Sequence, residues 1–178
     1  MLWIAALVAA ILLAIERVGY VLIWRNPAGF TRLCSRGWIF GKRDPVEALY
    51  RLFLVFKCIQ VGVFVAWWSL FDGRFPPLPS APMHLLVIGA GLFVIGQILN
   101  VGVFWRLGKT GVFYGNRLGH ELPWVTGFPF SVVPHPQYVG TMISIWGIFL
   151  VMRYPHPDWI IVPLIQTLYL LLAMRLER

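Results

Sequence analysis

The feature that most constrains this chain is a series of apolar stretches long enough to cross a lipid bilayer. They run over residues 2–24, 48–71, 83–105, 138–152 and 159–174. A membrane-spanning helix needs about 20 predominantly apolar residues. The first three stretches meet that length, whereas the last two are short and are joined by the tight sequence RYPHPD, so they form either two tilted spans or one hairpin that barely crosses. We therefore expect an all-α integral membrane bundle of four to five transmembrane segments.

The composition supports a membrane protein built as one unit. Of the 178 residues, 59% are hydrophobic and only 12% are charged, whereas a soluble domain is about half apolar and about a quarter charged. We expect a single domain over residues 1–178. The first apolar stretch lacks a basic leading region and is long for a signal peptide, so we expect it to be retained as the first span. Two cysteines, Cys34 and Cys58, indicate neither a disulfide framework nor a metal site.

The basic residues between the apolar stretches predict the orientation of the chain, because cytoplasmic loops are enriched in lysine and arginine. Only Arg74 and Arg153 lie on one side of the predicted bundle. Ten lie on the other: Arg25, Arg32, Arg36, Lys42, Arg43, Arg106, Lys109, Arg117, Arg175 and Arg178. The N-terminus is thus expected to face out and the loop 106–136 to face the cytosol. The net charge of +8 follows from this topology and from attraction to anionic lipid headgroups, and we expect no nucleic-acid partner.

The cytosolic segment 106–136 has the composition of a ligand-binding loop. Backbone that cannot be helical is tolerated at membrane depth only where it is buried in protein or lines a cavity, and residues 120–140 contain four prolines. Glycines, among them Gly111 and Gly115, allow backbone to approach a ligand closely. The same segment keeps several aromatic and aliphatic residues, so it is expected to lie against the membrane. These features predict a site but no reaction.

A longer motif within this region indicates the chemistry. The sequence GVFYGNRLGHELPWVTGFPFSVVPHPQYVGTMISIWG closely resembles the core of the phospholipid methyltransferases, which methylate phosphatidylethanolamine and its N-methyl derivatives. Residues 120–140 also resemble the isoprenylcysteine carboxyl methyltransferases. The resemblance covers roughly residues 96–178, with a weaker match in GKRDPVEALYRLFLVFKCIQ. It implies methyl transfer from S-adenosylmethionine, bound in a pocket at the cytosolic surface beside a lateral opening for the phospholipid substrate.

The resemblance also implies roles for particular residues. His135, Pro136 and Tyr138 match the His-Pro-x-Tyr motif at the cofactor, and Glu177 matches one glutamate of a C-terminal acidic pair. His120 matches a histidine of the carboxyl methyltransferases. The expected cofactor-binding residues are therefore His135, Pro136, Tyr138, Gly111, Gly115 and Glu177.

Three departures from the family patterns qualify these assignments. Leu176 stands where the first acid of the C-terminal pair is expected. Pro134 replaces an arginine of the carboxyl methyltransferases, and since an arginine fork suits a carboxylate, its absence favours an amine substrate. Gly89 and Gly91 match a Gly-x-Gly of the animal enzymes but lie about 25 Å from the cytosolic loop by helix rise. They are outside candidates for cofactor binding, since small residues at this spacing are more often helix-packing contacts.

An amine substrate must lose a proton before it can attack a methyl group. An ethanolamine amine should titrate near lysine, at about 10, so a base or a desolvating site is required. The candidate catalytic residues are His120 with Glu121, and His135, which is also interpreted as a pocket wall. Tyr114, Tyr138 and Trp124 are candidate cation–π partners. Glu16 and Arg17 interrupt the first span and are interpreted as structural; because neighbouring helical residues do not face each other, we expect no pair between them.

Two alternatives stay open at this point. One is a carboxyl or thiol methyltransferase of the same architecture, and the other is a non-catalytic membrane subunit that keeps the fold. The sequence does not fix the preferred methylation step, the acyl chains or the oligomeric state. A eukaryotic source would place the protein in the endoplasmic reticulum membrane and a bacterial one in the inner membrane.

Overall fold

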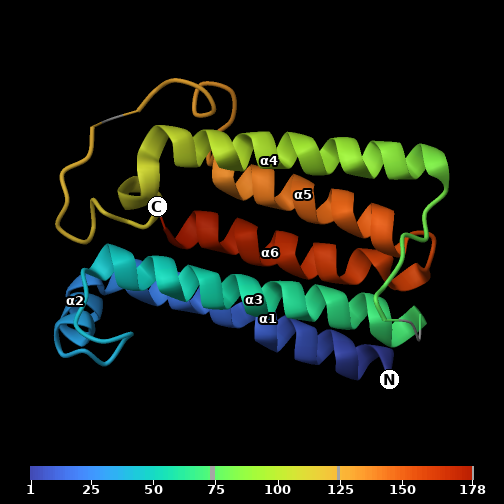
Figure 1. The fold of residues 1–178 in the computed structure, drawn as a ribbon, viewed down its shortest axis with the longest axis horizontal. Coiled ribbons are helices and arrows are strands. Elements are labelled where there is room, and N and C mark those ends of the chain that lie inside the picture. Colours follow the sequence, from blue (N-terminus) through green and yellow to red (C-terminus); the bar gives the residue numbers. More distant parts are fainter. Residues whose placement is uncertain (73–74, 124, 178) are drawn as a thin grey trace.

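The structure, a computed structural model, describes residues 1–72, 75–123 and 125–177. Arg74 and Arg178, two of the basic residues counted above, and Trp124, a candidate cation–π partner, lie outside the described residues. The described chain folds into a bundle of long helices whose axes run roughly side by side (Figure 1). The elements are α1 (Leu2–Arg25), α2 (Pro27–Ser35), α3 (Pro45–Asp72), α4 (Met83–Val112), α5 (Pro136–Arg153), the 3₁₀ helix η1 (Pro157–Ile160) and α6 (Ile161–Leu176).

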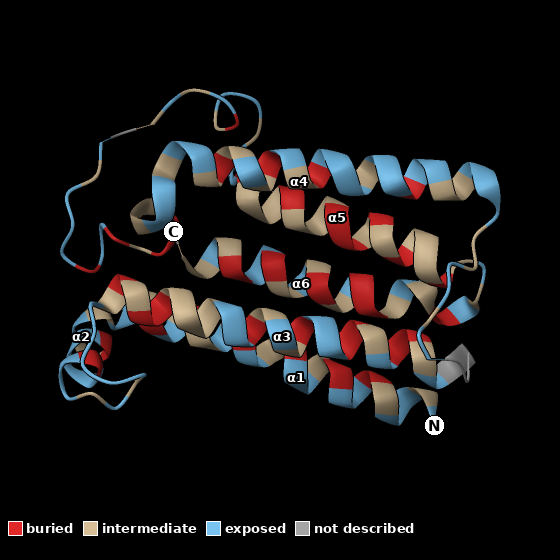
Figure 2. Ribbon diagram, viewed as in Figure 1, coloured by how far each residue is buried: buried red, intermediate tan, exposed pale blue. Residues whose placement is uncertain are grey.

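The expected helical membrane bundle is confirmed. Among the described residues, four helical segments are long and apolar enough to cross a membrane: Leu2–Arg25, Pro45–Leu70, Met83–Val112 and Pro157–Leu176. Helix α5 has 18 residues and lies along α4 (Figure 1). The last two apolar stretches therefore form two separate helices joined by η1. Many large apolar residues are exposed, and along each long helix exposed residues alternate with buried ones (Figure 2), as expected where lipid replaces water as the surroundings.

Two helix starts depend on side chains that the sequence places just ahead of a proline. The Asn26 Oδ1 accepts a hydrogen bond from the Gly29 N–H at 2.9 Å, and the Asp44 Oδ1 accepts one from the Val46 N–H at 2.9 Å. Such caps satisfy the free N–H groups of a first helical turn, and proline suits the first helical position. Helix α2, which begins this way, was not predicted, because its nine residues carry no long apolar run.

Glycines allow α4 and α5 to pack with their backbones almost touching. A Cβ added to Gly147 would lie 2.5 Å from the Gly89 carbonyl oxygen, and one added to Gly140 would lie 2.6 Å from that of Gly96. Small residues at helix contacts are the usual solution for association within a membrane. Gly89 is thus a helix-packing contact, whereas an added Cβ on Gly91 would meet nothing within 4 Å.

The predicted basic side of the bundle is one physical end of the molecule. The connection 26–44, the segments 113–123 and 125–135 and the end of α6 gather there, while residues 75–82 and 154–160 lie at the opposite end (Figure 1). We call these the basic end and the far end. Arg153, counted above on the less basic side, is buried at the far end in an ion pair with Asp158.

Candidate active site

At the basic end, residues distant in sequence converge on the C-terminus of α6. They come from the second half of α1, the turn that follows α4, the first turn of α5 and the last residue described in the chain. The centre of this group is a hydrogen bond in which the Tyr138 hydroxyl donates to the Glu177 Oε2. Both residues were predicted to hold the cofactor, and the structure brings them together across the interface of α5 and α6.

Only one of the two Glu177 carboxylate oxygens takes part in this hydrogen bond. It follows α6 directly, and its backbone N–H donates to the Ala173 carbonyl at 3.0 Å. Its second carboxylate oxygen, Oε1, is buried and accepts no hydrogen bond from the residues that the structure describes. A buried polar atom without a partner is uncommon in native proteins and calls for an explanation.

A cluster of aromatic rings around Tyr114 lies at the same end of the bundle as the Tyr138–Glu177 pair. Tyr114, in the left-handed conformation with φ of 56°, lies edge-on to Tyr20 at 6.0 Å and to Trp24 at 5.1 Å between ring centroids. The Arg117 guanidinium lies 4.2 Å from the centroid of the Trp24 ring. Burial raises the pKa of the Tyr114 hydroxyl, and the electrostatic effects of Tyr138 and Glu177 raise it further. Tyr114 therefore keeps its proton at physiological pH and presents a hydrogen-bond donor.

The charges within α1 form a buried cluster beside this aromatic group. Glu16 is 5% exposed; its Oε1 lies 3.0 Å from the Lys57 Nζ and 3.3 Å from the Arg17 Nη2. The Lys57 Nζ also donates to the Gln60 Oε1 at 2.8 Å. The expectation that Glu16 and Arg17 do not pair is therefore wrong. Their Cβ atoms diverge, but the arginine side chain is long enough to return to the neighbouring carboxylate.

The two candidate catalytic histidines have different surroundings. The His135 ring lies edge-on to the Tyr138 ring at 6.2 Å, and the residue adopts the left-handed conformation with φ of 53° just before α5. The His120 Nε2 lies 3.5 Å from the Asp44 Oδ2. The carboxylate partner of His120 is therefore Asp44, in the connection 26–44 between α1 and α3. Glu121, the expected partner of His120, is exposed. His135 is the histidine that contacts the Tyr138–Glu177 pair.

The remaining predicted residues shape the backbone of the site. The Gly115 N–H donates to the Thr110 carbonyl at 2.8 Å, and the Gly115 carbonyl accepts from the Leu118 and His120 N–H groups at 3.0 and 2.9 Å. A side chain at Gly115 would lie 2.6 Å from the Thr110 carbonyl oxygen. Gly111 lies in the last turn of α4, and Pro136 is buried at the start of α5. Gly115 thus fixes the turn that carries Tyr114.

Sequence reasoning missed Tyr20 and the break in α4. Tyr20 lies one turn beyond Glu16 and Arg17 on the same helix, so polar residues recurring at helical spacing inside an apolar stretch were the available signal. Gly108 has φ of 61° and separates the membrane part of α4 from the turn that leads to Tyr114.

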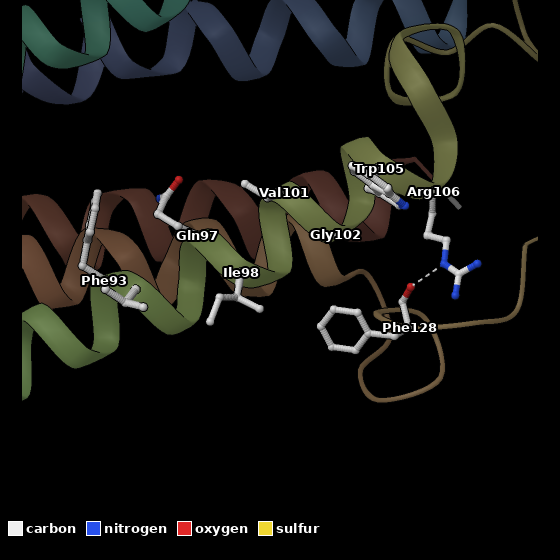
Figure 3. Close-up of a pocket in the computed structure, with 9 residues that line it drawn as sticks. Phe93, Gln97, Ile98, Val101, Gly102, Trp105, Arg106 and Phe128 are labelled. Carbon is white, nitrogen blue, oxygen red and sulfur yellow. Dashed lines mark hydrogen bonds between the residues drawn. The ribbon is translucent and has the colours of Figure 1, made fainter.

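A groove of about 690 Å³ runs along the outer face of α4 towards the basic end (Figure 3). At its end the Arg106 Nε donates to the Phe128 carbonyl at 3.1 Å. Phe128 lines the groove, and Phe130 packs against the buried cluster that contains Tyr20. Its lining residues are Phe93, Val94, Gln97, Ile98, Val101, Gly102, Trp105, Arg106 and Phe128. The groove is thus a long apolar surface with one cationic group at its end.

Comparison with known proteins identifies the family. The sequence model of the phospholipid methyltransferases matches residues 85–178, from α4 to the C-terminus. The chain belongs to the phospholipid methyltransferase family. Among its relatives is a phosphatidyl-N-methylethanolamine N-methyltransferase from Arabidopsis thaliana, 34% identical over 78% of this chain and 75% of the relative. Membership confirms the family that the motif resembles and makes the chain a methyltransferase enzyme.

Further relatives of this phospholipid methyltransferase match over shorter stretches. Phosphatidylethanolamine N-methyltransferase B from Dictyostelium discoideum is 38% identical over 67% of this chain and 56% of the relative. A phosphatidyl-N-methylethanolamine N-methyltransferase from Saccharomyces cerevisiae is 41% identical over 35% of this chain and 31% of the relative. No solved structure matches the chain. Within the residues that the structure describes, no group of three or more histidine, cysteine, aspartate or glutamate side chains is arranged to hold a metal ion.

Proposed function

We propose that this phospholipid methyltransferase transfers a methyl group from S-adenosylmethionine to the amine of phosphatidylethanolamine or of its mono- and dimethyl derivatives. The observation that carries the proposal is the partly engaged Tyr138–Glu177 pair, which lies at the same end of the bundle as a cluster of aromatic rings. The relatives are named for N-methyltransferases that act on phosphatidyl-N-methylethanolamine or phosphatidylethanolamine, and these names support an ethanolamine phospholipid as the substrate class.

The residues at the basic end fit the chemistry of this cofactor. S-adenosylmethionine carries a methyl group on a positively charged sulfur, together with an amino-acid end. The free Oε1 of Glu177 offers a negative acceptor, and the rings of Tyr20, Tyr114 and Tyr138 offer cation–π surfaces. Tyr138, Glu177, His135 and Pro136 would hold the cofactor, with the turn at Gly111 and Gly115 closing over it. Gly89 and Gly91 are left out, because Gly89 packs against α5.

The groove along α4 suits the lipid substrate. Its mostly apolar lining suits an acyl chain in the membrane. Arg106, at one end of the groove, is a cation that could bind the phosphate of the lipid headgroup. The segment from Phe128 to Phe130 joins the groove to the buried cluster around Tyr20. A lipid in the groove would therefore have its headgroup close to the segment that borders the proposed cofactor site.

A base at the basic end would prepare the amine for attack. The ammonium form has no free electron pair, and a pKa near that of lysine, about 10, keeps most of the substrate protonated at neutral pH. His135 lies against Tyr138 and is our first candidate to accept the proton. His120 and Glu121 remain the second, with Asp44 positioned to stabilise a protonated His120.

The proposed orientation puts the basic end in the cytosol. The test uses a Cys58→Ala background and introduces Leu78→Cys at the far end or Ser131→Cys at the basic end, both at exposed positions. A membrane-impermeant thiol reagent on intact cells is expected to label the cysteine at position 78 and not the one at 131. Labelling at position 131 alone would reverse the orientation.

The activity test is a methyl-transfer assay with the purified protein in lipid vesicles. Radiolabelled S-adenosylmethionine is supplied with vesicles containing phosphatidylethanolamine, its monomethyl or its dimethyl derivative, and with a prenylated cysteine substrate as the comparison. Label is expected in at least one lipid amine and not in the prenylated cysteine. Label in the cysteine substrate alone would overturn the proposal in favour of a carboxyl methyltransferase.

A further inference from the structure

Arg17 and Glu177 lie at the same level of the bundle. Helices α1 and α6 both run from the far end to the basic end (Figure 1), and they pack against each other. The Tyr169 hydroxyl of α6 donates to the Ala10 carbonyl of α1 at 3.0 Å, which fixes their register. Since every helix advances about 1.5 Å per residue, seven residues further along each helix bring Arg17 level with Leu176, next to Glu177.

Each of these two side chains has one buried polar atom left unsatisfied. The Arg17 Nε, a donor, and the Glu177 Oε1, an acceptor, have no hydrogen-bond partner among the described residues. The Arg17 side chain is 12% exposed, so water offers it little compensation. Tyr20 lies beside Arg17, whose Cζ is 6.0 Å from the Tyr20 ring centroid, and the Tyr20 ring lies edge-on to that of Tyr114 at 6.0 Å.

The charged groups near Arg17 and those near Glu177 do not neutralise each other within either helix. One carboxylate, Glu16, faces two cations, Arg17 and Lys57, so a positive charge remains on the α1 side. On the α6 side, the Glu177 carboxyl group receives a hydrogen bond from the Tyr138 hydroxyl, and among the described residues no cation pairs with it. The Arg17 Nε and the Glu177 Oε1 are thus a buried donor and a buried acceptor, each without a partner among the described residues, at one level of the bundle.

We propose that Arg17 is a further cofactor-binding residue, which holds the α-carboxylate of an amino-acid zwitterion while Glu177 holds its ammonium group. The inference rests on the proposed function, because S-adenosylmethionine ends in such a zwitterion. An arginine N–H suits a carboxylate, and such charge-assisted hydrogen bonds are the stronger kind. Arg17 lies outside residues 85–178, which the family model matches, so the first span supplies a contact that the matched region lacks.

The experiment compares two ligands that differ only in the carboxylate. Isothermal titration measures the binding of S-adenosylmethionine and of decarboxylated S-adenosylmethionine to the purified full chain, to Arg17→Gln and to Arg17→Lys. The parent is expected to prefer S-adenosylmethionine by about 10- to 100-fold, the usual worth of a hydrogen bond to a charged group. Arg17→Gln is expected to lose that preference while binding the decarboxylated ligand as the parent does, and Arg17→Lys to retain part of it.

Arg175→Gln is the matched control, because Arg175 is an exposed arginine in the last turn of α6 and is expected to leave both affinities unchanged. A parent that binds neither ligand would overturn the proposed function together with this inference. A parent that binds both ligands equally, or an Arg17→Gln protein that keeps the full preference, would overturn the role of Arg17 alone. If the Arg17 variants do not fold, the preference of the parent decides.

Discussion

The two ends of this bundle each contain a buried ion pair, and the two differ in how completely they are satisfied. At the far end, the Arg153 Nε and Nη2 donate to the two Asp158 oxygens at 2.8 and 2.9 Å. The Trp67 Nε1 adds a third hydrogen bond to Asp158 at 3.0 Å. At the basic end, Glu16, Arg17 and Glu177 are also buried or nearly so, yet Arg17 and Glu177 each keep an unpartnered polar atom.

This difference separates a pair that holds the fold from a group that is arranged for a ligand. Buried charges are costly unless they are paired and hydrogen-bonded, and the far end meets that requirement with protein groups alone. The basic end meets it only in part. Binding of a cationic, zwitterionic cofactor by these unpartnered atoms would explain why the cost is retained there.

The largest expected effect is on turnover at the basic end. His135→Ala should lower the methylation rate by about 10²- to 10⁴-fold, the usual worth of general-base assistance, beyond any loss of cofactor affinity, which titration with S-adenosylmethionine measures separately. Raising the pH should partly rescue the rate, because below a pKa of about 10 each unit of increase in pH makes the neutral amine about tenfold more abundant.

The matched control for His135 is His84→Ala, an exposed histidine in the first turn of α4 at the far end, where no change is expected. Rates are measured with purified protein over a series of pH values. A parental rate for His135→Ala at neutral pH would move the base to His120, and the same measurement on His120→Ala would then show the loss.

Breaking the far-end pair should reduce stability instead of function. Asp158→Ala leaves Arg153 buried with its main partner removed, which typically costs about 3–5 kcal/mol. Thermal unfolding in detergent should show a large drop, while folded protein at low temperature should bind S-adenosylmethionine as the parent does. Parental stability, or a selective loss of cofactor affinity, would contradict the assignment of this pair to the fold.

Weakening the Tyr138–Glu177 hydrogen bond at the basic end should instead reduce cofactor binding and leave stability largely unchanged. Tyr138→Phe removes the donor of the hydrogen bond and Glu177→Gln removes the negative charge of its acceptor, and we expect cofactor affinity to weaken by about 1–3 kcal/mol. The unfolding temperature should stay close to that of the parent or rise with Glu177→Gln, since a partly satisfied buried charge is removed. Unchanged affinity in both variants would take this pair out of the site.

The smallest expected effect is on stability, at the glycine contact between α4 and α5. Gly147→Ala places a methyl group 2.5 Å from the Gly89 carbonyl and should destabilise the protein by about 1–3 kcal/mol, as overpacking does. Gly91→Ala meets open space and should be neutral or slightly stabilising, because alanine favours a helix over glycine by about 1 kcal/mol. Equal unfolding temperatures for the two variants would contradict the packing described for α4 and α5.

The sequence predicted the helices better than the arrangement of their charges. Apolar length placed the long helices to within about three residues, except that α4 continues seven residues beyond the predicted end at 105. The family motif selected Tyr138 and Glu177, which meet in space. The pairing of Glu16 with both Arg17 and Lys57 was missed, because it depends on side-chain reach and on the register of α1 against α3. Asp44 as the partner of His120 was missed for a similar reason, since no sequence pattern brings the connection 26–44 next to residue 120.

We propose above all that the cofactor binds at the basic end, at Arg17, Tyr138 and Glu177. Hydrogen exchange followed by mass spectrometry, with and without S-adenosylmethionine, tests this location directly. We expect slower exchange in residues 113–119, 135–140 and 173–177 and in the second half of α1, with no change at residues 154–160. Protection confined to the far end, or binding without protection at the basic end, would contradict the account.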